Sequence, residues 1–134
     1  MRKKIRVLLI EPLSEPRIVT VEHTLEKLQE LVGGYIQAVY PWEDPVGLVC
    51  NEDGIGLGLP LNRSLKDENG NVYDIVKGSF FITGLSRDNF SSISDKQASK
   101  YAELFQYPEL YMRTEDGHVI CFKIGSKEQP EFLF

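Results

Sequence analysis

Four polar residues on two adjoining loops are the side chains in this sequence whose chemistry suggests a site. Asn51 and Glu52 precede a glycine-rich turn, and Asn62 and Arg63 follow it. The guanidinium of an arginine offers a planar fork that fits a phosphate or a carboxylate. The amide of an asparagine carries a donor and an acceptor that can read the edge of a base or a ribose. These residue types predict the binding of a small ligand, and none of them requires catalysis.

Two tyrosines extend this set, because an aromatic ring supplies a face on which a flat ligand can stack. Tyr35 and Tyr73 lie near the two loops in the pattern of predicted elements. We therefore expect a small-ligand pocket lined by Asn51, Glu52, Asn62, Arg63, Tyr35 and Tyr73. A structural interpretation stays open, in which Asn62 and Arg63 satisfy backbone groups and pair with Glu52 or Asp53.

The three glycines between these pairs do not match a nucleotide-binding loop. They are spaced Gly-Ile-Gly-Leu-Gly over residues 54–58, so the last glycine of the dinucleotide fingerprint would fall on Leu59. Pro60 then stands where a capped helix should follow. The sequence contains no Gly-Lys-Ser or Gly-Lys-Thr, which excludes a P-loop. Asp53-Gly54 instead predicts a turn, because glycine tolerates a positive φ.

The sequence offers no convincing catalytic or metal-binding set. His23 and His118 are the only histidines, and together with Cys50 and Cys121 they lack the spacing of a zinc site. Each cysteine lies in an apolar run, which predicts a buried, reduced thiol. Paired carboxylates flank turns, where solvation explains them. We therefore expect no catalytic residue, no metal ligand and no cofactor.

Aromatic residues on a loop and in the tail support an alternative function. Trp42 lies between two prolines, and the sequence ends Glu-Phe-Leu-Phe, with Phe132 and Phe134 as its aromatic residues. Aromatic side chains on loops are frequent hot spots of protein interfaces. The alternative is thus a protein-interaction module that inhibits or redirects another protein. Exposed strand edges and an apolar tail would also suit a homo-oligomer.

The bulk composition excludes some partners. The chain has 134 residues and a net charge of −5, which disfavours broad binding to nucleic-acid phosphates. No apolar run approaches the ~20 residues that span a bilayer. The basic start leads into an apolar run at 7–10 that is too short for a signal peptide. We expect a cytoplasmic protein that binds neither nucleic acid nor membrane.

The hydrophobic pattern predicts two helices, each with a recognisable cap. Thr24 is a candidate N-cap for a helix at 24–32, which Gly33-Gly34 ends. Ser94 and Gln97 have the spacing of a capping box at the start of a second helix at 95–106.

Short strands account for most of the remaining chain. They are predicted at 5–10, 17–22, 35–40, 46–50 and 79–83, with a final hairpin that turns on Asp116-Gly117. Residues 59–65 are predicted to be irregular or a short helical turn. The order β-β-α-β-β-β-α-β-β indicates a single α+β domain. In it, a mostly antiparallel sheet carries both helices packed on one face.

Several blocks of the sequence together resemble a known family, the domain of unknown function 3846 family. The blocks are Leu31-Val32-Gly33-Gly34-Tyr35-Ile36, Val49-Cys50-Asn51-Glu52, Gly58-Leu59-Pro60-Leu61-Asn62-Arg63 and the segment 78–84. The likeness forms a core at about 5–84 and continues more loosely to the helix near 100, within the C-terminal helix and hairpin at 94–134. The final hairpin and tail at 109–134 lie outside it. The turn after Asn51-Glu52 departs from the family, because Gly54-Ile55-Gly56 is apolar where the family has a lysine.

The resemblance implies a bacteriophage or mobile-element setting in bacteria and no known activity. By analogy with small phage proteins, it favours a non-catalytic protein that binds a nucleotide-like ligand and sequesters a host immune signal. A host protein as the partner and hydrolysis of a nucleotide signal are the two alternatives.

Overall fold

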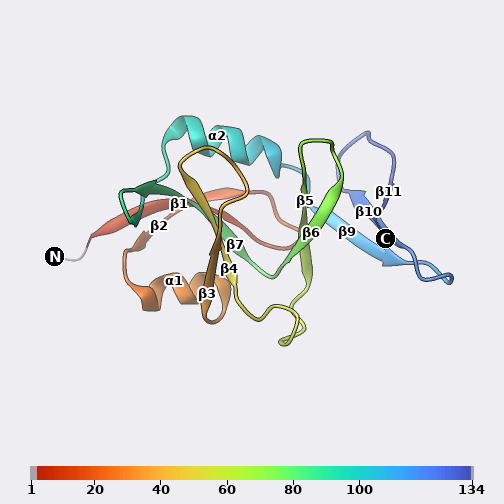
Figure 1. The fold of residues 1–134 in the computed structure, drawn as a ribbon, viewed down its shortest axis with the longest axis horizontal. Coiled ribbons are helices and arrows are strands. Elements are labelled where there is room, and N and C mark those ends of the chain that lie inside the picture. Colours follow the sequence, from red (N-terminus) through yellow and green to blue (C-terminus); the bar gives the residue numbers. More distant parts are fainter. Residues whose placement is uncertain (1–2, 134) are drawn as a thin grey trace.

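The computed structural model describes residues 3–133, which form two helices and eleven strands (Figure 1). The helices are α1 (Leu25–Val32) and α2 (Asp95–Leu104). The strands are β1 (Lys4–Ile10), β2 (Arg17–Glu22), β3 (Ile36–Val39), β4 (Val46–Asn51), β5 (Leu61–Lys66), β6 (Val72–Lys77), β7 (Phe80–Ser86), β8 (Asn89–Ser91), β9 (Glu109–Arg113), β10 (Val119–Lys123) and β11 (Glu131–Phe132). The α+β class is confirmed, and the predicted elements occur in the predicted order.

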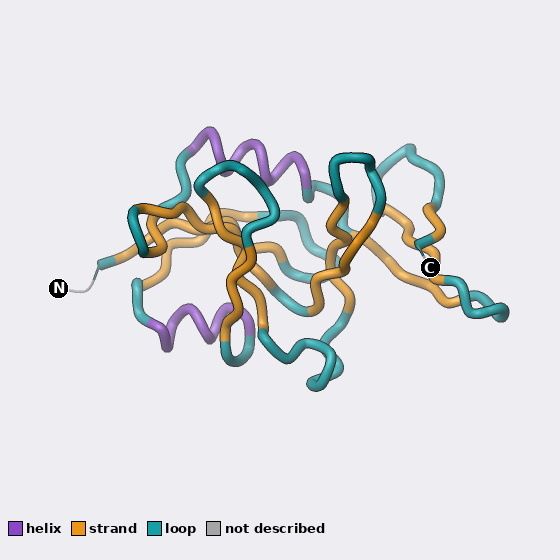
Figure 2. Tube along the Cα trace, in the orientation of Figure 1, coloured by secondary structure: helices purple, strands orange, loops and turns teal. Residues whose placement is uncertain are grey.

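The main sheet has the strand order β2-β1-β7-β4-β3, with β8 paired to the far part of β7. Every strand pair in it is antiparallel. The strands predicted at 5–10 and 17–22 correspond to β1 and β2, which pair as a hairpin with Lys4 opposite Glu22. Two smaller units stand beside this sheet, the β5–β6 hairpin and the three-stranded sheet β9–β10–β11 (Figure 2).

The two helices lie on opposite faces of the main sheet, so the prediction that both pack on one face is wrong (Figure 1). Alternate residues of β1 separate into two cores. Leu8 and Ile10 pack in the core that contains Tyr101 of α2, whereas Val7 and Leu9 pack in the core that contains Leu28 of α1. The central strands are apolar at both odd and even positions, and a strand that is buried on both faces needs cover on both.

Local capping signals explain where each helix begins. The side chain of Thr24 accepts from the Lys27 N–H, and Gly33 ends α1 with a left-handed φ of 75°. Ser94 and Gln97 form the predicted capping box at the start of α2. Neither helix of the described residues has the length and apolar character needed to cross a membrane.

The segment at 59–65 contains strand β5, which contradicts the prediction of an irregular segment or a helical turn. β5 pairs with β6 around a turn at Asn69-Gly70, in which Gly70 has a φ of 81°. The final hairpin is confirmed, since β9 and β10 pair around Asp116-Gly117. β11 adds a third strand to that hairpin, and contacts between β5 and β9 join the two smaller units.

The glycine-rich segment at 52–58 is a turn-rich loop with its own hydrogen bonds. The backbone N–H of Leu57 donates to the Asp53 carbonyl, and that of Leu59 donates to the Gly54 carbonyl. The positive φ falls on Gly58, at 65°, and not on Gly54 as the Asp-Gly signal predicts. Gly54 is needed for space instead, because a Cβ there would lie 2.9 Å from the Cβ of Lys77.

Candidate functional site

Asn62 and Arg63 are fully buried in the structure, with no exposed surface on either residue. The Asn62 amide donates to the carbonyls of Ile10 and Gly78, at 2.9 and 2.8 Å. Its oxygen accepts from the Arg63 guanidinium at 2.8 Å. These contacts leave Asn62 no group for a ligand, so its side chain joins β5 to the ends of β1 and β6.

The Arg63 guanidinium bonds two distant parts of the chain as well as its neighbour Asn62. Its Nε donates to the Phe105 carbonyl at 3.1 Å, just beyond the last turn of α2. Its Nη2 donates to the Ser14 carbonyl in the β1–β2 turn at 2.7 Å. Burial lowers the pKa of Arg63, and the negative charge of Glu109 counteracts that effect. Of the two interpretations of this pair, the geometry fits the one in which it satisfies the backbone, through carbonyl groups and not through Glu52 or Asp53.

Asn51 and Glu52 line a cleft of about 260 Å³ between β4, β6 and the 52–58 loop. The Asn51 amide is occupied, since it donates to the Val32 carbonyl at 3.1 Å and accepts from the Asp53 N–H at 2.8 Å. Three carboxylates and one lysine line this cleft: Glu52, Asp53, Asp74 and Lys77. This excess of negative charge disfavours a phosphate group.

Tyr35 does not line that cleft and is 71% exposed. Its carbonyl accepts from the Glu52 N–H at 3.0 Å, so its backbone stays close to the loop. Tyr73 lies elsewhere, in β6. The structure therefore separates the six predicted ligand residues. One pair is buried, one pair lies at the acidic cleft, and the two tyrosines lie outside that cleft.

A second cleft brings Tyr73 together with Trp42. It consists of two adjoining hollows that share Trp42, Leu104 and Lys123 and have volumes of about 90 and 570 Å³. The inner hollow is lined by Pro41, Trp42, Ser64, Leu65, Lys66, Tyr73, Leu104, Phe105, Glu109 and Lys123. The outer hollow is lined by Trp42, Lys100, Tyr101, Glu103, Leu104, Gln106, Tyr107, Lys123 and Glu128. We call the two together the Glu109 cleft.

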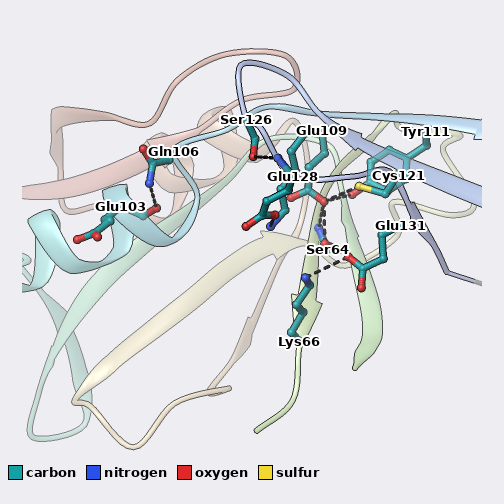
Figure 3. Close-up of polar contacts among 11 residues, drawn as sticks. Ser64, Lys66, Glu103, Gln106, Glu109, Tyr111, Cys121, Ser126, Glu128 and Glu131 are labelled. Atoms are coloured by element: carbon teal, nitrogen blue, oxygen red, sulfur yellow. Dashed lines mark hydrogen bonds and ion pairs between the residues drawn. The ribbon is translucent and has the colours of Figure 1, made fainter. Parts of the chain in front are cut away.

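Glu109, the first residue of β9, is the buried charge of this cleft, and only 5% of its surface is exposed (Figure 3). Its Oε1 accepts from the Ser64 N–H at 3.1 Å and the Ser64 hydroxyl at 2.7 Å. The same oxygen accepts from the Tyr111 hydroxyl at 2.8 Å and the Cys121 thiol at 3.2 Å. Four donors thus fix one carboxylate oxygen, and they hold β5, β9 and β10 together.

Two lysines at the inner hollow are engaged by acidic residues of the last segment of the chain. Lys66 pairs with Glu131 at 3.0 Å, as Figure 3 shows, and Lys123 pairs with Glu128 at 3.3 Å. These side chains are 25–66% exposed, and exposed ion pairs contribute only about 0–1 kcal/mol. An incoming anion can therefore compete for either ammonium group.

Trp42 is fixed in the wall of the cleft by contacts with α2. Its ring lies 4.6 Å from that of Tyr101 and 6.1 Å from that of Phe105. The Tyr101 hydroxyl donates to the Asp44 carboxylate at 2.7 Å, and Lys100 also bonds that carboxylate. These hydrogen bonds, with that of Lys100 the largest cause, lower the pKa of Asp44.

Phe132, the second predicted anchor, is 67% exposed on β11, and Phe134 lies outside the described residues.

Neither cysteine is an activated nucleophile. Burial, reinforced by the charge of Glu109, raises the pKa of Cys121 to about 12. Burial also raises the pKa of Cys50, which lines the acidic cleft. Both thiols are free. Cys121 is buried, as predicted, whereas Cys50, for which burial was also predicted, is only partly buried. Within residues 3–133, no three His, Cys, Asp or Glu side chains gather in a way that could hold a metal ion.

The thiol environments predict unequal labelling of the folded chain. At pH 8, a disulfide reagent should leave Cys121 unmodified, because the thiolate is the reactive form and burial suppresses it. Cys50 should react, but more slowly than a free thiol, and both should react in urea. Intact-mass spectrometry with peptide mapping measures the two rates. Rapid labelling of Cys121 in the folded chain would contradict the Glu109 network.

The Glu109 network was missed in the sequence although part of its pattern is visible there. Glu109 and Tyr111 stand two residues apart on one strand, and the hairpin register places Cys121 opposite Tyr111. This pattern puts the three side chains on one face of the hairpin. Their burial depends on β5, which supplies Ser64 and which the sequence did not predict as a strand.

These features define a small α+β domain with a helix on each face of an antiparallel sheet and a polar cleft beside it. The chain belongs to the family described as Domain of unknown function (DUF3846), whose model matches residues 5–106. This match confirms the resemblance, including its looser extension to the helix near residue 100, which is α2. No curated protein and no solved structure matches the chain.

Proposed function

We propose that this protein is a non-catalytic binding protein for a small nucleotide-like ligand, which it holds in the Glu109 cleft. The observation that carries the proposal is the buried Glu109 carboxylate, which four donors hold at the inner hollow. Burying a charge is costly unless it is well compensated, and a ligand with hydrogen-bond donors would use the group. Sequestration of a host signal, as in counter-defence, is the role we propose for such binding.

The surroundings of Glu109 support a ligand that is flat at one end and anionic at the other. Trp42 and Tyr73 offer aromatic faces on which a base can stack. Lys66 and Lys123, in exposed ion pairs, can turn to a phosphate. The outer hollow, at about 570 Å³, falls within the ~300–1,000 Å³ common for ligand pockets.

The chemistry of the cleft supports binding without reaction. The thiol nearest the carboxylate, Cys121, is protonated at neutral pH because its pKa is raised to about 12. The ligand should therefore be recovered unchanged after incubation with the protein, and chromatography measures this. Its conversion to a product would favour the hydrolase alternative.

The two exposed tyrosines give a matched test of the position of the site. Tyr73→Ala should weaken nucleotide binding about tenfold, because loss of one stacking face costs about 1–3 kcal/mol. Tyr35→Ala, which removes a ring outside the cleft, should leave the affinity unchanged. Trp42 is the only tryptophan of the chain, so its fluorescence can follow titrations with mononucleotides, cyclic nucleotides and ADP-ribose. Binding that is insensitive to Tyr73 but lost in the Tyr35 variant would overturn the assignment.

A second candidate function, protein interaction, is favoured by the outer face of the β9–β11 sheet. Leu110, Met112 and Phe132 are 45%, 54% and 67% exposed there. Met112 and Phe132 both lie opposite Ile120 in the register, so they share one face. Apolar surface of this kind suits a protein partner or a second copy of the chain. If this is the function, no nucleotide will change the fluorescence of Trp42.

A further inference from the structure

The second carboxylate oxygen of Glu109 is a polar atom of the cleft to which no described residue donates. All four donors to Glu109 bond Oε1, and no described residue donates to Oε2. No side-chain nitrogen or oxygen of the described residues is both fully enclosed and without a partner, so Oε2 is at least partly exposed, and Glu109 lines the inner hollow. Buried carboxylates ordinarily use both oxygens. The inner hollow therefore presents one anionic acceptor.

The two lysines of the inner hollow that could pair with Oε2 form ion pairs with other carboxylates. The ammonium of Lys66 bonds Glu131, and that of Lys123 bonds Glu128. Lys123 stands directly opposite Glu109 in the β9–β10 register, so its side chain is on the same face. The last segment of the chain thus draws both cations toward its own carboxylates, and Oε2 is left for a donor from outside.

An ionised carboxylate only accepts hydrogen bonds, so it selects for N–H groups and repels carbonyl oxygens. Trp42 and Tyr73 line the same hollow, which favours a donor carried on a flat ring. We infer that Glu109 accepts a hydrogen bond from the exocyclic amino group of a nucleobase, so that the protein prefers amino-bearing bases to their oxo counterparts. This inference rests on the proposed function, and it goes further by naming the recognised group.

Nucleotide pairs in which an oxygen replaces this amine provide the probes, and in each pair the adjacent ring nitrogen changes from an acceptor to an N–H donor. Adenosine monophosphate carries an amine where inosine monophosphate carries an oxygen, and cytidine and uridine monophosphates form the same contrast. The wild-type chain should bind the amino member of each pair at least about tenfold more tightly, since the oxo member places a carbonyl against a charged acceptor. The fluorescence of Trp42 reports all four titrations.

Glu109→Gln is the matched variant, because its amide oxygen can still accept from Ser64, Tyr111 and Cys121. These three residues supply the four donors that fix the oxygen. The amide nitrogen therefore takes the place of Oε2, and a donor replaces an acceptor there. The preference should vanish or reverse toward the oxo nucleotides. Glu26→Gln makes the same change on the exposed surface of α1 and should leave the preference unchanged.

The outcomes separate the inference from the function on which it rests. If none of the four nucleotides binds the wild-type chain, the proposed function fails. If they bind but the two members of each pair are equal, the function stands and the inference is overturned. A preference that survives Glu109→Gln in a chain of unchanged melting temperature would also overturn it. Should that variant not fold, the wild-type comparison decides the matter alone.

Discussion

Replacing Arg63 with methionine is expected to lower the free energy of unfolding by about 3–5 kcal/mol, a large part of the stability of a domain of this size. Methionine can follow the aliphatic stem of arginine but donates no hydrogen bond. The carbonyl of Phe105 and the amide oxygen of Asn62 would lose a donor inside the protein, and the carbonyl of Ser14 would lose one at a partly buried position. Buried acceptors without partners carry their full cost of desolvation. Urea denaturation followed by circular dichroism measures the loss.

Arg6→Met is the control for this prediction. Arg6 pairs with Asp95 on the surface, where its side chain is 44% exposed, and its loss should cost about 1 kcal/mol or less. The loss of unfolding free energy for Arg63→Lys should lie between those of Arg6→Met and Arg63→Met. A single ammonium group cannot reach all three acceptors that the planar guanidinium bonds. Equal destabilisation by the Arg6 and Arg63 substitutions would mean that the buried guanidinium does not hold the chain together.

The position of Arg63 also explains why the site could not be located from the sequence. Asparagine and arginine are typical of ligand pockets, and the sequence gives their types but not their partners. Three of the partners lie 42 to 52 residues away, at the ends of β1 and α2 and in the turn after β1, and Gly78 lies 16 residues away. Only the folded arrangement of these segments turns two polar residues into a buried joint.

The helices were predictable because their signals are local. A side chain that caps its own helix, as Thr24 and Ser94 do, acts within three residues. The side of the sheet that each helix covers depends instead on the strand order, which brings β7 between β1 and β4. Apolar residues at both odd and even positions of those strands carry the signal for two covered faces.

The strand β5 was missed for a related reason. A half-buried strand is recognised by alternation of polar and apolar residues, and two adjacent polar residues that are both buried break that pattern. Asn62 and Arg63 are such a pair. Because β5 was not predicted, neither its contacts with β9 nor the Glu109 cleft could be predicted. The candidate site therefore lies at Glu109 and not at the loop residues that the sequence suggested.

Asn62→Asp tests the second half of the buried joint with almost no change in shape. The substitution replaces the amide group that donates to the carbonyls of Ile10 and Gly78 by a carboxylate oxygen, which would face both of them. We expect a loss of about 3 kcal/mol or more at pH 7, because two buried acceptors lose their donor and the neighbouring Arg63 guanidinium offsets only part of the charge placed against them. Chemical denaturation of the variant and the wild-type chain measures the difference.

The dependence of this loss on pH separates charge from shape. At low pH the introduced carboxyl is protonated and can donate to one of the two carbonyls, so the difference in stability should shrink as the pH falls. Asn69→Asp makes the same exchange in the exposed β5–β6 turn and should change the stability by about 0.5 kcal/mol or less at any pH. A loss at Asn62 that is small, or that does not change with pH, would show that its amide is not the donor that joins β5 to β1. The proposal that this pair is structural, and that the ligand binds at Glu109 instead, would then have to be reversed.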